Sequence, residues 1–138
     1  MIIADTSGLL ALFNRGEPEH TQVRELVRGL DAPMVVSPYV VAEIDYLVAT
    51  RLGVDAELEV LKELSGGAYV LPDIGHEDLV RAAGVIERYR DQDIGATDAS
   101  IVVLAECYTS RTLLTLDRRH FSVLRPLQGG RFTLLPRA

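Results

Sequence analysis

The chain has little cysteine and little lysine, and each shortage excludes a class of site. Its 138 residues include one cysteine, Cys107, and one lysine, Lys62. A single thiol cannot form an intrachain disulfide or a cysteine-based zinc site. Because Cys107 lies in the apolar run 101–108, we expect a buried thiol. With no GxxxxGK motif, the chain also lacks a phosphate-binding loop of the Walker type.

Long apolar runs and net positive charge are also missing. No stretch approaches the ~18 consecutive apolar residues of a transmembrane helix. The first residues lack the basic leader of a secretory signal, so we expect a cytoplasmic protein that does not bind membranes. The net charge of −6 argues against a purely electrostatic nucleic-acid binder. It does not exclude a nuclease, since acids around a metal contribute to that value.

What the chain does have is a regular alternation of short apolar runs and longer amphipathic segments. This pattern is typical of βαβ units and a parallel sheet. We expect strands at 1–4, 34–37, 68–71, 112–116 and 131–135. We expect helices at 7–13, 18–30, 38–52, 55–64, 77–89, 97–108 and 118–121. The sequence therefore predicts one α/β domain over residues 1–138, with a mostly parallel five-stranded sheet covered by helices on both faces.

Four carboxylates lie at strand ends or inside helices of this predicted fold. Asp5 follows the first strand and Asp117 ends the run 113–117, where sites of such folds form. Glu43 and Asp98 lie within predicted helices. These acids converge only if the strands of Asp5 and Asp117 are neighbours, which is an assumption at this stage. A group of acids without its own basic residue needs a cation, and Mg²⁺ prefers such oxygen ligands. Metal-assisted hydrolysis of a phosphodiester is the leading interpretation.

Each acid also has a structural explanation. Asp5 and Asp117 could cap the helices that follow them, and Asp98 could be an acid favoured by the helix dipole. Glu43 cannot be a cap, because it lies in mid-helix at the edge of an apolar stripe. We expect it to be half-buried and to need a cation or a donor, and an ion pair with an arginine is its alternative.

Hydroxyl residues flank two of the acids. Thr6, Ser7 and Thr115 could orient a carboxylate or a metal-bound water molecule, although helix capping and β-propensity explain them equally well. The three histidines, His20, His76 and His120, show no metal-ligand spacing. We expect them to be surface or structural residues.

Four short motifs in this order resemble the PIN domain. They are Ile3-Ala4-Asp5-Thr6-Ser7, Val41-Ala42-Glu43-Ile44, Thr97-Asp98-Ala99-Ser100 and Thr115-Leu116-Asp117. The resemblance covers essentially the whole chain, and the short length is similar to VapC-type toxins of toxin–antitoxin pairs. It implies an endoribonuclease dependent on Mg²⁺ or Mn²⁺, which forms a homodimer and is silenced by a cognate antitoxin. It also implies a metal held mainly by Asp5 and Asp98, with Glu43 and Asp117 completing the pocket.

The resemblance also suggests what the four acids do in RNA hydrolysis. Asp117 is expected to bind the metal through water or to hold a second ion, and Glu43 to orient or deprotonate the attacking water. Products with a 5′-phosphate and a 3′-hydroxyl should result, because water is the nucleophile. Apolar residues on segments 19–30 and 55–64 are expected to form a dimer or antitoxin groove, with an antitoxin arginine reaching the acids. These residues are Val23, Leu26, Val27, Leu58, Leu61 and Leu64.

Three other functions stay open at this point. A phosphatase of the haloacid dehalogenase type would use Asp5 as nucleophile, but it needs a second aspartate where Ser7 stands and a helper lysine. A receiver domain also needs a lysine near the acids. A non-catalytic PIN-like scaffold is the third alternative, and the intact acids count against it.

Overall fold

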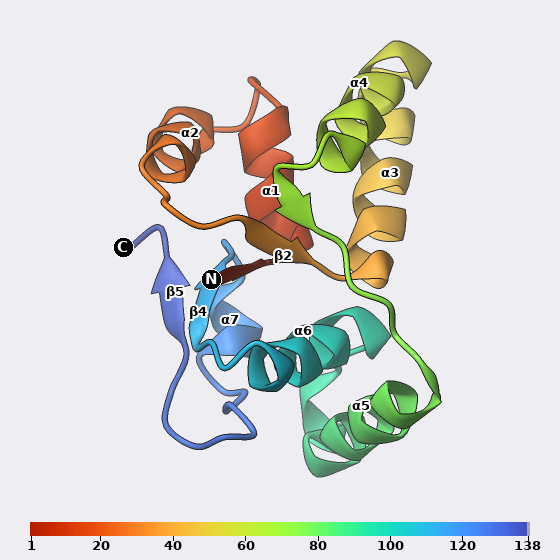
Figure 1. Ribbon diagram of the computed structural model, residues 1–138, viewed down its shortest axis with the longest axis vertical. Helices are drawn as coiled ribbons and strands as arrows, with labels where there is room; N and C mark the ends of the chain where they lie inside the picture. Colours follow the sequence, from red (N-terminus) through yellow and green to blue (C-terminus); the bar gives the residue numbers. More distant parts are fainter. Residues whose placement is uncertain (138) are drawn as a thin grey trace.

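The computed structural model describes residues 1–137 and contains a five-stranded sheet in the order β3-β2-β1-β4-β5 (Figure 1). The strands are β1 (Ile2–Ala4), β2 (Met34–Val36), β3 (Tyr69–Val70), β4 (Thr112–Leu114) and β5 (Thr133–Leu135). All four neighbouring pairs are parallel. The predicted α/β class and parallel five-stranded sheet are therefore confirmed, with strands somewhat shorter than expected.

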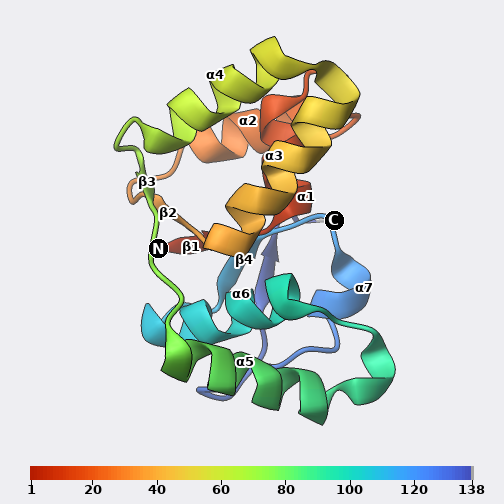
Figure 2. The same cartoon turned by 90° about the vertical axis from the view of Figure 1, so that its right-hand side faces the viewer.

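Helices connect the strands and cover both faces of the sheet. They are α1 (Thr6–Phe13), α2 (His20–Arg28), α3 (Pro38–Leu52), α4 (Val54–Ser65), α5 (His76–Arg88), the 3₁₀ helix η1 (Arg90–Gln92), α6 (Ala96–Cys107) and α7 (Arg118–Phe121). Helices α1 to α4 lie on one side of the sheet, and α5 and α6 lie on the other (Figures 1 and 2). No helix of residues 1–137 has the length and apolarity to cross a membrane.

The central position of β1 confirms the assumption on which the convergence of the acids depended. β1 pairs with β4 on one side and with β2 on the other. Pairing continues past the strand ends, because the backbone N–H of Asp5 donates to the carbonyl of Leu114 at 2.8 Å. Asp117 follows β4 by three residues, so both aspartates lie at the same edge of the sheet.

Two close contacts fix the helices that carry the site. Gly8 of α1 lies against β4, where an added Cβ would be 2.6 Å from the carbonyl oxygen of Leu114. Only glycine allows α1 to approach the sheet this closely. Helix α6 is buried from Ala99 to Ala105, as its nearly continuous apolar sequence predicts. Both helices are therefore held rigidly against the sheet that positions the acids.

The expectation of a buried Cys107 was wrong, since this thiol is exposed. Cys107 is the last residue of α6, where the helix emerges from the core, and Arg81 of α5 donates to its Sγ at 3.6 Å. Some residues assigned to a partner groove instead belong to the core. Val23 is fully buried and Leu64 is 2% exposed, whereas Leu58 is 59% exposed.

Candidate active site

Asp5 is buried and held by two hydroxyl groups from different parts of the chain. Its Oδ2 accepts hydrogen bonds from Ser7 at 3.0 Å and from Thr115 at 2.8 Å. Burial raises the pKa of Asp5, whereas these two hydrogen bonds and the backbone of Thr6 lower it. Asp5 occupies the N-cap position of α1 but makes no side-chain cap bond. The capping explanation therefore fails for this carboxylate.

The same two hydroxyls also hold the segment that leads to Asp117. Ser7 Oγ accepts from the backbone N–H of Leu116 at 2.9 Å, and Thr115 Oγ1 accepts from that of Asp117 at 2.9 Å. Each hydroxyl thus uses its proton for Asp5 and its lone pairs for the segment after β4. This small network couples the position of Asp5 to that of Asp117.

Thr6 differs from the other two predicted hydroxyl residues. Its side chain is buried, yet its Oγ1 has no hydrogen-bond partner among residues 1–137. Thr6 influences Asp5 only through its backbone N–H, which lowers the pKa of the carboxyl. The structure therefore brings the hydroxyls of Ser7 and Thr115, but not that of Thr6, to the carboxylate.

Asp98 enters the site from the first turn of α6. Burial, followed by the charge of Asp5, raises its pKa to about 6, and the charges of Asp117 and Glu43 act in the same direction. A nearby histidine, His120, opposes this shift. Three acids therefore raise the pKa of a single carboxyl group, which is the expected result of their convergence.

A buried pair of serines fixes α6 relative to α3. Ser37 caps α3 by accepting from the N–H of Tyr39, and its Oγ lies 2.7 Å from that of Ser100. Ser100 donates to the carbonyl of Thr97, so Ser37 supplies the proton between the two serines. The helices that carry Glu43 and Asp98 are thereby joined near their N-terminal ends.

Asp117 combines a capping role with a place in the acid cluster. Its Oδ1 accepts from the backbone N–H of His120 at 3.1 Å, and its Oδ2 lies 2.9 Å from His120 Nδ1. The imidazole also lies 3.8 Å from Asp98 Oδ2. Its hydrogen bond to Asp117 raises the pKa of His120. His120 therefore brings a positive charge to the cluster when it is protonated.

His120 is the site residue that sequence reasoning missed. It was expected to be a surface or structural histidine, because no second histidine or cysteine stood at a metal-ligand spacing. The sequence signal that could have identified it is its spacing of three residues from Asp117. Residues three apart share one face of a helix, and the strand end at Asp117 begins such a helix.

The expectation of a half-buried Glu43 was wrong, since this residue is exposed. On α3 the fully buried residues are Val40, Ile44 and Val48, which are spaced four apart. Glu43 lies about 100° around the helix from Ile44, on the solvent side of that stripe. Its predicted alternative, an ion pair with an arginine, is also absent within residues 1–137. Glu43 therefore lies at the rim of the cluster, close enough for its charge to raise the pKa of Asp98.

The donor set fits a hard divalent cation. One ligand atom from each of Asp98, Asp117 and His120 lies within 4.8 Å of the other two, and Asp5 adds a buried carboxylate. In the described part of the chain, no lysine or arginine nitrogen lies within 4.0 Å of these three carboxylates. Carboxylate oxygens with a single imidazole suit Mg²⁺ or Mn²⁺. Figure 2 shows α7 on the same side of the molecule as the loop that enters α6.

Comparison with known proteins agrees with this geometry. The family model of the PIN domain matches residues 2–125. Ribonuclease VapC26 of Mycobacterium tuberculosis is 58% identical over 135 residues, which cover 98% of this chain and all of that protein.

Two solved structures share the fold at 17% identity. One is Mycobacterium tuberculosis VapC20, described as a sarcin–ricin loop cleaving toxin, with a TM-score of 0.82 over 92% of this chain and 98% of that one. The other is a toxin–antitoxin complex from Klebsiella pneumoniae, with a TM-score of 0.71 over 90% and 92% of the two chains. By its acids, its fold and its relatives, the chain belongs to the PIN domain family and is a VapC-type member of it.

Proposed function

We propose that residues 1–138 form a single endoribonuclease domain that uses Mg²⁺ or Mn²⁺ and is the toxin of a toxin–antitoxin pair in the cytoplasm. The observation that carries this proposal is the convergence of Asp5, Asp98 and Asp117 at one sheet edge. Burial and the charges of neighbouring carboxylates raise the pKa values of both Asp5 and Asp98, as expected where acids gather in a pocket. The 58% identity to a ribonuclease supports RNA as the substrate class.

The residues divide into those that hold the ion and those that act on water. Asp5 and Asp98 would hold Mg²⁺, and Asp117 would bind it through water or hold a second ion. Bound there, the ion lowers the pKa of a water molecule and offsets negative charge on the phosphate. Ser7 and Thr115 keep the Asp5 carboxylate in one orientation. His120 shares a proton between its Nδ1 and Asp117 Oδ2, and so affects how strongly Asp117 attracts a cation.

Glu43 is proposed to orient or deprotonate the attacking water. Its exposed place at the rim favours this role over metal ligation, because a base there meets water that enters from solvent. Attack by water, rather than by the ribose 2′-hydroxyl, would leave a 5′-phosphate and a 3′-hydroxyl. A haloacid dehalogenase type of phosphatase is less compatible with the site. Ser7 stands where that class needs an aspartate, and Lys62 lies exposed on α4.

A protein partner is proposed for the groove between α2 and α4. This groove has a volume of about 600 Å³ and is lined by apolar residues such as Leu12, Val27 and Leu52 together with several charged ones. Among these apolar residues, Leu52 is 45% exposed. An antitoxin segment with an apolar face would cover them, and its arginine could reach the acids. We also propose a homodimer, since Val80 of α5 is 72% exposed.

The test of this function is cleavage of single-stranded RNA by the purified protein, with analysis of the product ends. We expect activity with Mg²⁺ or Mn²⁺, none in EDTA, and 5′-phosphate products. Asp98→Asn should lose at least ~10²-fold in rate, whereas Asp91→Asn, a change of the same kind on η1, should have no effect. Activity that survives chelation would exclude the metal, and 2′,3′-cyclic phosphate products would exclude water as the nucleophile.

A further inference from the structure

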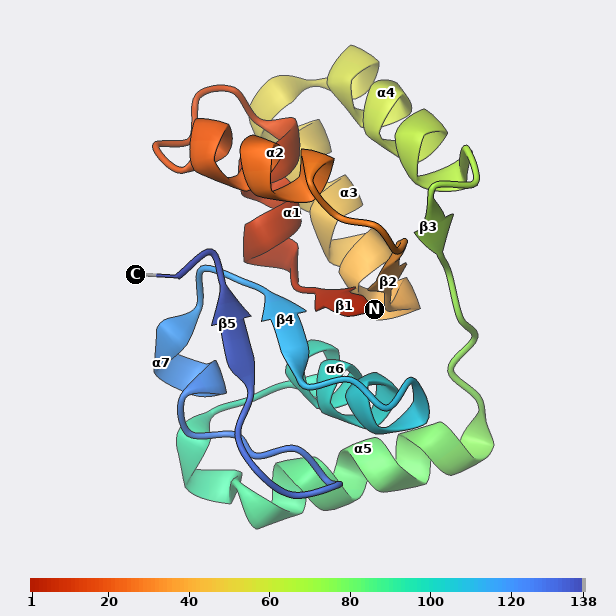
Figure 3. The ribbon, with the colours of Figure 1, turned by 60° about the vertical axis from the view of Figure 1, so that its left-hand side comes forward.

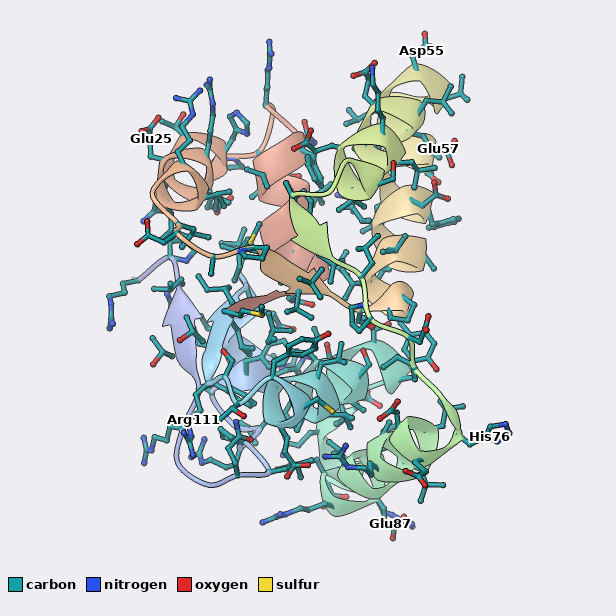
Figure 4. All side chains as sticks on the ribbon, viewed as in Figure 1. Glu25, Asp55, Glu57, His76, Glu87 and Arg111 are labelled. Carbon is teal, nitrogen blue, oxygen red and sulfur yellow. The ribbon has the colours of Figure 1, made fainter. Side chains whose placement is uncertain are left out.

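Positive charge is concentrated in the last fifth of this acidic chain. Residues 111–138 contain six of its 14 basic residues and only one of its 20 acids, Asp117. Elsewhere acids predominate. Figure 4 shows Glu25, Asp55 and Glu87 at the outer surfaces of α2, α4 and α5, whereas Arg111 lies beside the start of β4. Although the net charge is −6, one region of the molecule, on the side of β4 and β5, is therefore basic.

Four of these arginines surround one hollow between α7 and β5. The hollow has a volume of about 550 Å³, and Arg118, Arg125, Arg131 and Arg137 contribute to its walls. β5 is the edge strand of the sheet, and α7 lies beside it (Figure 3). The hollow thus lies at the outer edge of the sheet.

The four guanidinium groups have no acidic partner among the residues that the structure describes. Arg118 donates to the carbonyl of Pro136, and Arg125 donates to that of Ser122 at 2.7 Å. These bonds orient the two side chains without neutralising their charge. Within residues 1–137, no acidic side chain lies within 4.0 Å of any of the four groups.

Four arginines elsewhere contrast with this group, because each pairs with an acid. They are Arg28, Arg51, Arg81 and Arg90. The hollow therefore concentrates positive charge that no acidic side chain of residues 1–137 compensates. An anionic ligand would supply the missing charge, because arginine binds phosphate through two parallel hydrogen bonds.

An aromatic ring stands among these charges. Phe132 lies next to Arg131 in sequence, lines the hollow and is partly exposed. Buried Phe121 supports it edge to face, with ring centroids 6.4 Å apart and an interplanar angle of 87°. Basic side chains with an accessible aromatic ring are typical of sites for single-stranded nucleic acid, where bases stack on the ring.

Helix α7 joins this hollow to the acid cluster. Asp117 caps the helix and His120 lies in the cluster, while Arg118 and Phe121 of the same four-residue helix line the hollow. We propose that the hollow binds the backbone of single-stranded RNA, with a base on Phe132, beside the phosphate to be cleaved. This inference rests on the proposed ribonuclease function and assigns its substrate contacts. An acidic peptide would pair with the arginines, but its carboxylates would not stack on Phe132.

The test is binding of a short fluorescent single-stranded RNA in EDTA, measured by anisotropy at several salt concentrations. Arg131→Gln/Arg137→Gln removes two side chains that make no hydrogen bond within the described residues, so the fold should persist. The slope of log affinity against log salt should decrease in magnitude by about 1.4, the value for two lost contacts to a single strand. The control, Arg88→Gln/Arg90→Gln, removes equal charge from the α5 side and should keep the wild-type slope. Phe132→Leu should weaken binding about tenfold with an unchanged slope.

The outcomes separate this inference from the function on which it rests. If the protein cleaves RNA but the double variant keeps the wild-type slope, the hollow is not the RNA site, although the nuclease assignment stands. If wild type neither binds nor cleaves RNA, both proposals fail. Binding of an oligoglutamate peptide that the double variant loses, with RNA binding unchanged, would assign the hollow to an acidic protein segment and overturn the RNA assignment.

Discussion

The Thr115 hydroxyl donates to the Asp5 carboxylate at 2.8 Å, across two neighbouring strands that lie 110 residues apart in the chain. The same hydroxyl accepts from the backbone N–H of Asp117. One side chain thus holds two acids of the candidate site. Since the hydroxyl is fully buried, no solvent molecule is available to replace it without rearrangement.

Thr115→Val should therefore reduce activity without abolishing the fold. The substitution keeps the shape but leaves the Asp117 N–H without its partner and Asp5 with the Ser7 hydroxyl alone, which should cost about 1–3 kcal/mol of unfolding free energy. Loss of orientation should lower activity or metal affinity about 10–100-fold. Thr112→Val on the same strand is the control and should change neither. The measurements are denaturant unfolding and RNA cleavage, and wild-type activity in Thr115→Val would show that the hydroxyl does not position the acids.

Gly8 provides a test of how closely α1 must approach the sheet. In Gly8→Ala the new Cβ would meet Leu114 backbone and side-chain atoms at 2.6 to 2.9 Å, so we expect a loss of about 1–3 kcal/mol. Activity should fall as well, because Ser7 moves with the helix. Gly84→Ala in α5 has no atom within 4 Å of its new Cβ. It should stabilise the protein by about 0.5–1 kcal/mol, and equal effects of the two changes would refute the close contact.

Asp98 should make the metal-free protein less stable as pH rises. Its pKa is raised from 3.8 to about 6 in the folded state, so the stabilisation from its protonated form is complete below pH 3.8 and is lost as pH rises through about 6. The difference corresponds to about 3 kcal/mol, which solvent screening reduces to about 1–2 kcal/mol. In EDTA at pH 7.5, Asp98→Asn should melt above wild type, and the gap should close toward pH 4. A variant that melts below wild type at both pH values would identify Asp98 as a purely structural acid.

His120 should have the opposite effect in the same experiment. Its raised pKa means that the protonated imidazole stabilises the folded state, fully below pH 6.5 and no longer once pH exceeds the raised value. In EDTA near pH 6, His120→Gln should melt below wild type, because Asp98 and Asp117 lose their nearby cation. Asp98→Asn and His120→Gln together distinguish the effect of charge repulsion on thermal stability from the effect of packing. A His120→Gln protein as stable as wild type near pH 6 would show that the imidazole does not compensate the acids.

The sequence predicted the convergence of the acids better than the exposure of individual side chains. Asp5 and Asp117 follow buried strands, and parallel strands carry their sites at the carboxyl edge. The order of the strands could not be predicted from the periodicity of the sequence, and the structure places β4 beside β1. Pairing over long sequence distances leaves no local signal.

The predictions of burial and of site membership failed for side chains whose surroundings depend on a small rotation around a helix or on where a helix ends. Glu43 is one residue from a fully buried isoleucine, and a turn of about 100° places it in solvent. Cys107 belongs to an apolar run, but the run extends past the end of the core. His120 required knowledge that a short helix follows Asp117. Burial at such positions depends on tertiary packing rather than on hydrophobic pattern.

The most direct test of the central claim is an anomalous diffraction map from crystals soaked in Mn²⁺. We predict a peak about 2.0–2.3 Å from carboxylate oxygens of both Asp5 and Asp98, with Asp117 reaching it directly or through water. The same crystals of Asp98→Asn should show a much weaker peak or none. A Mn²⁺ peak on Asp117 and His120 but remote from Asp5, or no peak among these acids at saturating Mn²⁺, would contradict the proposed metal site.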